Sequence, residues 1–460
     1  MAHNMKLFGT DGIRGTANQF PITPEVALRT GKAIAAVMAR QGDARRRVII
    51  GKDTRVSGYM LETALTSGLV SAGMDVFLVG PLPTPAVAHL TQSMGCVAGI
   101  MLTASHNPYQ DNGLKIFGGD GYKLSDALEE EIEEFILSPE PSDPASFGNH
   151  IGKATRIDDA RGRYIEFAKH TANNISLHGL KIVVDCGNGA AYMVAPLIFR
   201  ELGAEVITMA TSPDGKNIND GCGALHPEAA GALVREHGAD LGVSFDGDAD
   251  RAIFTDAQGR TIHGDRIIAL CALAMKRRNR LRGDTIAVTV MSNLGLHAAM
   301  SQAGIRTITT GVGDRQVIEA LRAHDHSFGG ENSGHLIFAD HATTGDGILS
   351  ALQVLSVMKE TGSSLDELAS CMEEYPQQLK SFSVSAKPAL ESLEDFSALL
   401  VEADAALGQH GRQLIRYSGT ENKARVMVEH RDAEVVRHWT EKLSMALQES
   451  ISGSSSNRPS

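Results

Sequence analysis

The chain has 460 residues, which is too long for one compact core, so we expect several domains. Its formal net charge is −12, from 43 Lys and Arg against 55 Asp and Glu, which disfavours a surface that binds nucleic acid or a membrane. Five cysteines without a paired metal spacing argue against a disulfide scaffold or a zinc site, and the N-terminus lacks the apolar stretch of a signal peptide, so we expect a cytoplasmic protein.

The first predicted helix begins near Thr23, a suitable N-cap, with Pro24 at its first position. Apolar residues at helical spacing predict its buried face: Val26, Ala33, Ile34, Val37 and Met38.

Three segments of the chain then repeat one order of elements. Each opens with a short β-branched strand, passes through a polar turn into a helix, and reaches a second strand. The opening strands are Val48–Ile50, Ile182–Val184 and Ile286–Val290, and the helices end at Gly73, Gly203 and Gly304. We therefore predict three related α/β domains with mixed or mainly parallel sheets.

The pattern changes after about Tyr375. Short strands in KSFSVSA and ARVMVEH, together with two helices, predict a smaller C-terminal α+β domain. The predicted domain limits are 1–154, 155–259, 260–370 and 371–452, followed by a disordered tail over 453–460.

A first candidate site lies in GIMLTASHNPYQDNGLKIFG, where an apolar run leads to Ser105. Pro108 keeps the preceding residue extended, which predicts a loop at a strand end. A serine there can be a nucleophile or carry a phosphate, although a lone serine is more often a cap or turn residue. His106 and Lys115 could transfer protons, or could be ordinary surface groups.

A second candidate is the acidic loop in GVSFDGDADRAIF, which contains Asp246, Asp248 and Asp250, followed by Arg251. Alternate carboxylates in a turn can converge on one point, as a hard cation such as Mg²⁺ requires. An EF-hand is excluded because its sixth and twelfth positions would be Arg251 and Ala257. Apolar runs on both sides disfavour a merely solvated acidic turn.

Two further loops could contact a substrate. FGGENSGHLIF offers Glu331, Ser333 and His335 among glycines, which suits sugar hydroxyls, although a glycine-rich hairpin facing water is an equal alternative. IRYSGTENKARVMVE presents Arg416, Ser418, Gly419, Thr420 and Arg425, which suit a phosphate, with a solvated charged turn as the alternative. FGTDGIRG adds Arg14 for an anion.

The motifs TASHNP, DGDADR, GENSGH and RYSGTEN, in this order, resemble those of the α-D-phosphohexomutase family over nearly the full chain. FGTDGIRG and GGENSGH…TTGDGI are most similar to the branch that acts on glucosamine phosphates. The branch that acts on mannose and glucose phosphates usually has Met in place of Asn332. The resemblance implies four domains around a central cleft.

The resemblance also implies roles for individual residues. Ser105 would carry a phosphate, and this phosphoserine with Asp246, Asp248 and Asp250 would hold one Mg²⁺. Arg251 would contact that phosphate, and His106 and Lys115 would handle protons. The sugar would meet Arg14, Glu331, Asn332, Ser333 and His335, and the second phosphate would meet Arg416, Ser418, Gly419, Thr420 and Arg425.

The implied reaction is reversible conversion of glucosamine 6-phosphate to glucosamine 1-phosphate through a 1,6-bisphosphate, which also serves as primer. It would feed the synthesis of UDP-N-acetylglucosamine and cell-wall precursors. The resemblance is compatible with a homodimer. Tyr417 and Asn422 replace two prolines of the family's phosphate loop, which puts the stiffness of that loop in doubt.

Three alternatives stay open. A mutase of mannose or glucose phosphates would keep the mechanism and change the sugar. A phosphatase with an Asp nucleophile would usually read D-x-D-x-[TV], whereas the fifth residue here is Asp250. A non-catalytic sugar-phosphate binder would have lost Ser105 or the acidic loop, and both are present.

Overall fold

The computed structural model describes residues 7–9, 11–41, 45–138, 150–417 and 422–456. The chain divides into two compact units: Met1–Met291 with Ala303–Cys371, and Ser292–Gln302 with Met372–Ser460. No helix within the described ranges has the length and apolar character needed to cross a membrane.

A seven-stranded mixed sheet organises the N-terminal part of the first unit. Parallel pairing joins β5, β3, β4 and β7, and β6, β2 and β1 extend the sheet by antiparallel pairing. The strands are, in sheet order, β1 (Phe8–Gly9), β2 (Gly12–Thr16), β6 (Asp111–Gly118), β5 (Ala98–Leu102), β3 (Arg47–Lys52), β4 (Asp75–Pro81) and β7 (Ala154–Arg156).

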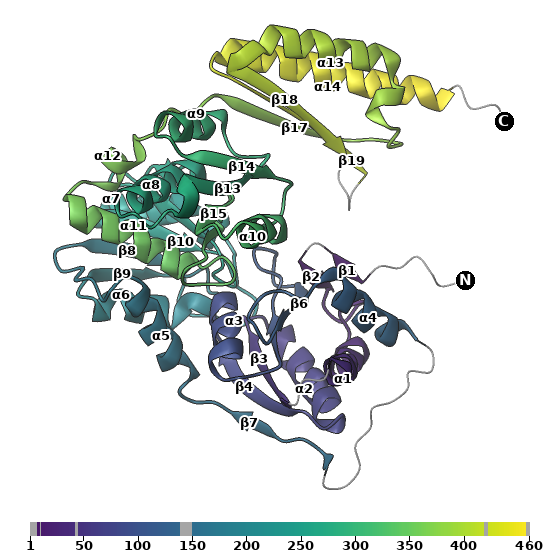
Figure 1. Ribbon diagram of the computed structural model, residues 1–460, viewed down its shortest axis with the longest axis vertical. Helices are drawn as coiled ribbons and strands as arrows, with labels where there is room; N and C mark the ends of the chain where they lie inside the picture. Colours follow the sequence, from purple (N-terminus) through teal and green to yellow (C-terminus); the bar gives the residue numbers. More distant parts are fainter. Residues whose placement is uncertain (1–6, 10, 42–44, 139–149, 418–421, 457–460) are drawn as a thin grey trace. The chain divides into compact units, whose positions relative to one another are not determined.

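Four helices cover this sheet (Figure 1). α1 (Pro24–Arg40), α2 (Ser57–Ser71) and α4 (Asp126–Leu137) share one apolar core with it, and α3 (Thr84–Ser93) packs against β3 and β5 on the other face. The predicted cap of α1 is confirmed, because the Thr23 side chain accepts from the backbone N–H of Val26 at 3.3 Å. The predicted inner face of α1 is also buried.

Two smaller mixed sheets follow in the first unit. β8, β9 and β10 are parallel in the second sheet, and β13, β14 and β15 in the third, so the predicted α/β class is confirmed. The strands are, in sheet order, β12 (Thr261–Ile262), β11 (Ala252–Thr255), β10 (Leu241–Phe245), β8 (Lys181–Asp185) and β9 (Glu205–Met209), then β14 (Arg306–Thr310), β13 (Thr285–Thr289), β15 (Phe328–Gly330) and β16 (Leu336–Phe338).

The helices of these two parts that belong to the first unit include the one predicted by the second copy of the repeat, Ala195–Glu201. They are α5 (Ala160–Thr171), α6 (Ala195–Glu201), α7 (Pro227–His237), α8 (Gly264–Arg277), α10 (Asp314–Ala323), α11 (Gly347–Thr361) and α12 (Leu365–Ala369). The predicted helix-closing residues Gly73, Gly203 and Gly304 all have positive φ, of 85°, 96° and 67°.

The second unit contains an antiparallel sheet in the order β17-β19-β18, with α13 and α14 on one face (Figure 1). Its elements are β17 (Gln377–Ser383), α13 (Glu394–Leu407), β18 (Gly411–Tyr417), β19 (Lys423–His430) and α14 (Ala433–Ser456). β18 was not among the predicted strands, and α14 continues into the predicted tail. α9 (Leu294–Gln302) also belongs here, since the backbone N–H of Leu294 donates to Glu429 Oε1 at 2.6 Å. The domain limits stay predictions.

The candidate loops of the first unit follow strands of its three sheets. β5 leads to Ser105, β10 to Asp246, and β15 to Glu331. Since carboxyl ends of parallel strands meet at one edge of a sheet, each sheet presents its polar loop at such an edge.

Candidate active site

Ser105 lies three residues beyond the fully buried strand β5. It is 1% exposed, and its φ of 50° is unusual for a residue with a side chain. Its Oγ donates to Asp246 Oδ2 at 2.5 Å, although the two residues are 141 positions apart in the chain. The structure therefore brings the predicted nucleophile and the acidic loop together.

The acidic loop connects β10 to β11, which pair antiparallel. The three carboxylates are buried, and each offers an oxygen that lies within 4.8 Å of the other two. Within the described part of the chain, Asp248 Oδ1 is buried without a hydrogen-bond partner. Convergent carboxylates that keep buried oxygens without a hydrogen-bond partner suit a hard divalent cation. These residues therefore fit the Mg²⁺ that the sequence predicts.

The pKa values of Asp246 and Asp250 are shifted in opposite directions. Burial, followed by the neighbouring charges of Asp250 and Asp248, raises the pKa of Asp246 well above its usual value. Burial alone would raise the pKa of Asp250 as well, but Lys115, His335 and Arg251 together outweigh it and hold that pKa well below its usual value. A bound cation would favour the ionised form of all three.

Lys115 projects from β6 into this group of carboxylates. Its Nζ lies 2.9 Å from Asp248 Oδ2, 2.9 Å from Asp250 Oδ2 and 3.3 Å from Asp11 Oδ2. Burial opposes its charge, but these carboxylates raise its pKa well above the usual value. Lys115 therefore remains a cation here, and its predicted role in proton transfer stays a prediction.

His106 lies between Ser105 and Arg251. Its Nδ1 is 3.4 Å from Ser105 Oγ and 3.3 Å from Arg251 Nη1. Burial first, then the charges of Arg251 and Arg14, lowers the pKa of His106 to about 4. The imidazole is therefore neutral at pH 7, and its Nδ1 can accept a hydrogen bond. Arg14 itself pairs with Asp11.

The predicted sugar loop is the turn between the antiparallel strands β15 and β16. The backbone is thus a glycine-rich hairpin, but His335 is only 2% exposed and its Nδ1 lies 3.6 Å from Asp250 Oδ1. Ser333 Oγ is buried without a hydrogen-bond partner among the described residues. Glu331 accepts from the backbone of Gly313 at 3.1 Å, and Asn332 donates to the carbonyl of Met291 at 3.4 Å.

His335 connects this hairpin to the acidic loop electrostatically. Burial alone would lower the pKa of His335, but Asp250, Asp314 and Glu331 together outweigh it and raise that pKa. The negative charge of Glu331 likewise helps to raise the pKa of Arg251. Charged groups of the hairpin and of the acidic loop therefore interact electrostatically.

Arg416 and Arg425 belong to the second unit, where they face each other across β18 and β19. Burial, followed by the charge of Arg425, lowers the pKa of Arg416. Two opposed guanidiniums favour an anionic ligand. The other predicted members of this loop, Ser418, Gly419 and Thr420, lie outside the described residues.

Sequence reasoning missed several charged residues of this region. Asp53 and Arg55 follow the end of β3 and touch the Ser105 loop. Lys123 pairs with Asp11 and with Asp314, which lies 3.7 Å from His335. The segment GKDTRVSG carried a usable signal, because charged residues directly follow a buried parallel strand there.

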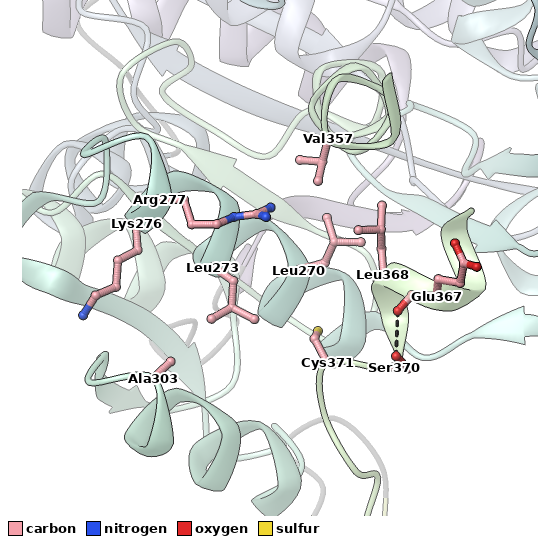
Figure 2. A pocket seen from close by; sticks show the side chains of 10 residues that line it. All are labelled: Leu270, Leu273, Lys276, Arg277, Ala303, Val357, Glu367, Leu368, Ser370 and Cys371. Carbon is pink, nitrogen blue, oxygen red and sulfur yellow. Dashed lines mark hydrogen bonds between the residues drawn. The ribbon is translucent and has the colours of Figure 1, made fainter. Parts of the chain in front are cut away.

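A separate cavity of about 700 Å³ lies away from these residues (Figure 2). Most of its lining residues belong to α8, α11 and α12, and Cys371 follows α12 (Figure 2). The lining is Leu270, Leu273, Lys276, Arg277, Ala303, Val357, Glu367, Leu368, Ser370 and Cys371. It contains no residue of the predicted site, so it has no evident part in the chemistry.

Comparison with known proteins agrees with this geometry. Models of the phosphoglucomutase/phosphomannomutase family match in four stretches: alpha/beta/alpha domain I over 5–142, domain II over 162–259, domain III over 263–375 and the C-terminal domain over 379–444. A phosphoglucosamine mutase from Geotalea daltonii is 51% identical, covering 98% of this chain and 99% of the relative. A phosphoglucosamine mutase from Sorangium cellulosum is 52% identical, covering 99% of this chain and 95% of the relative.

A solved structure extends the comparison to three dimensions. A phosphoglucomutase/phosphomannomutase family protein from Burkholderia thailandensis has a TM-score of 0.81 at 25% identity, covering 96% of this chain and 97% of that one. From these matches and from the buried group of Ser105 and three aspartates, the chain belongs to the phosphoglucosamine mutases, within the phosphoglucomutase/phosphomannomutase family.

Proposed function

We propose that this chain is an isomerase that interconverts glucosamine 6-phosphate and glucosamine 1-phosphate through a phosphoserine enzyme. The observation that supports the proposal best is Ser105 Oγ, held 2.5 Å from Asp246 inside a group of three buried carboxylates. A hydroxyl beside a cation site is the arrangement needed to carry a phosphoryl group.

In the first half-reaction, the bond between Ser105 Oγ and phosphorus breaks while a bond forms between phosphorus and O1 of the sugar. The O1 hydroxyl gives up its proton, and Ser105 Oγ takes up one proton to become a hydroxyl again. In the second half-reaction, the bond between phosphorus and O6 of the resulting 1,6-bisphosphate breaks while phosphorus bonds to Ser105 Oγ; the serine hydroxyl gives up its proton, and O6 takes one up. The sugar leaves as the 1-phosphate, and no phosphate is consumed overall.

The charges around Ser105 suit this transfer. Asp246, Asp248, Asp250 and a phosphoserine oxygen would hold Mg²⁺, which neutralises charge on the phosphoryl group. Arg251 lies between Asp250 and His106, close to where that phosphate would extend. His106 is neutral and within 3.4 Å of Ser105 Oγ, so it can receive the hydroxyl proton when the phosphoserine re-forms.

The remaining predicted residues would hold the substrate. Ser333 has an unsatisfied hydroxyl for a sugar oxygen, and His335 and Glu331 would complete that contact. Arg416 and Arg425 would hold the phosphate that is not being transferred.

The test is a comparison of initial rates with Mg²⁺ and glucose 1,6-bisphosphate as primer. Glucosamine 6-phosphate, mannose 6-phosphate and glucose 6-phosphate are assayed for the wild type, Ser105→Ala and the control Ser71→Ala, whose hydroxyl donates to the carbonyl of Gly68 in its own helix. We expect the highest kcat/KM with the amino sugar, and its loss in Ser105→Ala alone. A preference for mannose or glucose phosphate would keep the mechanism but refute the substrate. Labelled phosphate on Asp246 instead of Ser105 would indicate a phosphatase.

A further inference from the structure

Arg55 is a buried arginine that belongs to none of the predicted motifs. It is 0% exposed, and its guanidinium points into the loop that begins at Ser105. Nη2 donates to the carbonyl of Ser105 at 2.9 Å and to that of Asn107 at 2.7 Å. Nη1 donates to the carbonyl of Asp111 at 3.0 Å and to that of Pro108. The terminal donors of one side chain are thus all directed to the backbone of the nucleophile loop.

Asp53 completes this arrangement from the other side of the guanidinium. Its Oδ2 accepts from Arg55 Nε at 2.8 Å and from Thr103 Oγ1 at 2.8 Å. Thr103 Oγ1 in turn accepts from the backbone N–H of Ser105 at 2.9 Å. Both the N–H and the carbonyl of Ser105 are therefore connected to the ion pair of Asp53 and Arg55.

The loop that follows β9 contributes a further donor to the same backbone. Asn219 Nδ2 donates to the carbonyl of Ser105 at 2.9 Å and to that of Asn107 at 3.2 Å. The carbonyl of Ser105 therefore accepts both from Arg55 and from Asn219, which lies 114 positions along the chain. Several hydrogen bonds thus fix the backbone of Ser105, which explains how this residue keeps its unusual φ of 50°.

We propose that Arg55, oriented by Asp53, is a positioning residue that fixes Ser105 Oγ for phosphoryl transfer. The proposal rests on the proposed function and adds a residue that acts through Ser105 without touching the substrate. The unusual backbone of Ser105 directs its Oγ to Asp246, and the guanidinium holds that backbone through its carbonyls. Because both half-reactions use the same Oγ, loss of this positioning slows both.

A purely structural role for Arg55 makes a different prediction. Such a role would lower stability while leaving the folded fraction fully active. A positioning role lowers kcat in the folded protein and changes KM little, because the sugar and phosphate contacts lie on other elements.

The experiment uses the full chain phosphorylated on Ser105, with Mg²⁺. Arg55→Lys keeps a cation beside Asp53 but lacks the planar fork that reaches several carbonyls. Asn219→Ala removes the second donor to the Ser105 carbonyl without leaving a buried charge. If Arg55→Lys does not fold, this variant tests whether hydrogen bonds to that carbonyl position Ser105 Oγ. The matched control is Arg29→Lys, since Arg29 also donates to backbone carbonyls in the same part of the first unit, those of Phe135 and Ser138.

Two rates are measured at saturating glucosamine 6-phosphate and normalised to the folded fraction: kcat, and single-turnover transfer of labelled phosphate from Ser105 by rapid quench. We expect Arg55→Lys to lower both about 10- to 100-fold with KM within about threefold, and Asn219→Ala to lower both in the same way but less. Arg29→Lys should match the wild type.

Folded Arg55→Lys and Asn219→Ala proteins with wild-type transfer rates, or with a change in KM alone, would overturn the positioning role. An inactive wild type would overturn the proposed function itself. The two failures are therefore distinguishable in one set of measurements.

Discussion

Gly247→Ala is a direct test of how tightly the acidic loop and the nucleophile loop are packed. Gly247 lies between Asp246 and Asp248, and a Cβ there would stand 2.5 Å from the carbonyl oxygen of Ser105. It would also stand 2.8 Å from Ile218 Cδ1 and 3.0 Å from Asn219 Nδ2. The tip of Ile218 can rotate away, but the carbonyl of Ser105 is held by hydrogen bonds from both Arg55 and Asn219.

The expected size of the effect follows from these distances. The contact with the Ser105 oxygen has to lengthen from 2.5 Å to at least 3.0 Å, so the two loops must separate by about 0.5 Å or more. A misplacement approaching 1 Å can reduce a rate about 100-fold, so we expect kcat to fall about 10- to 100-fold. Overpacking should also lower the free energy of unfolding by about 1–3 kcal/mol.

The assay combines coupled initial rates at saturating glucosamine 6-phosphate and primer with urea unfolding. The matched control is Gly162→Ala in α5, where an added Cβ meets no atom within 4 Å. That change should keep wild-type activity and raise stability by about 0.5–1 kcal/mol, since alanine favours a helix. A Gly247→Ala enzyme with wild-type kcat would refute the claim that the two loops fix Ser105.

Three further outcomes are expected. Lys115→Met leaves Asp248 and Asp250 without their ammonium partner, so urea unfolding in EDTA should show a loss of about 3–5 kcal/mol. Mg²⁺ should recover part of that loss by binding the folded state, and an equal midpoint with and without Mg²⁺ would contradict the metal site. Removing divalent cations should abolish wild-type activity, and added Mg²⁺ should restore it. Burial raises the pKa of Asp346 to about 6 from 3.8, so the folded state keeps a proton that the unfolded state releases. Wild-type stability relative to Asp346→Asn should therefore fall between about pH 4 and pH 6, by at most about 3 kcal/mol, and stay level above pH 6; a difference independent of pH would refute this.

Local pattern alone determined much of this protein. Thr23 and Pro24 begin α1 because capping and a fixed φ act within one turn, and Gly73, Gly203 and Gly304 close helices because only glycine adopts positive φ freely. Strand β5 is a continuous apolar run because both of its faces are buried, and β10 departs from such a run only at Ser244. The candidate loops were visible because polar residues directly follow those runs.

Only the tertiary structure decided which of these loops meet. Ser105 and Asp246 are 141 residues apart, and the order of strands and the packing of the two sheets bring them together. Arg55 escaped sequence reasoning because its partners are backbone carbonyls, which have no residue type to mark them. Local propensity depends on neighbours within a few residues, whereas a site assembled from buried charges depends on distant segments that neutralise and hold one another.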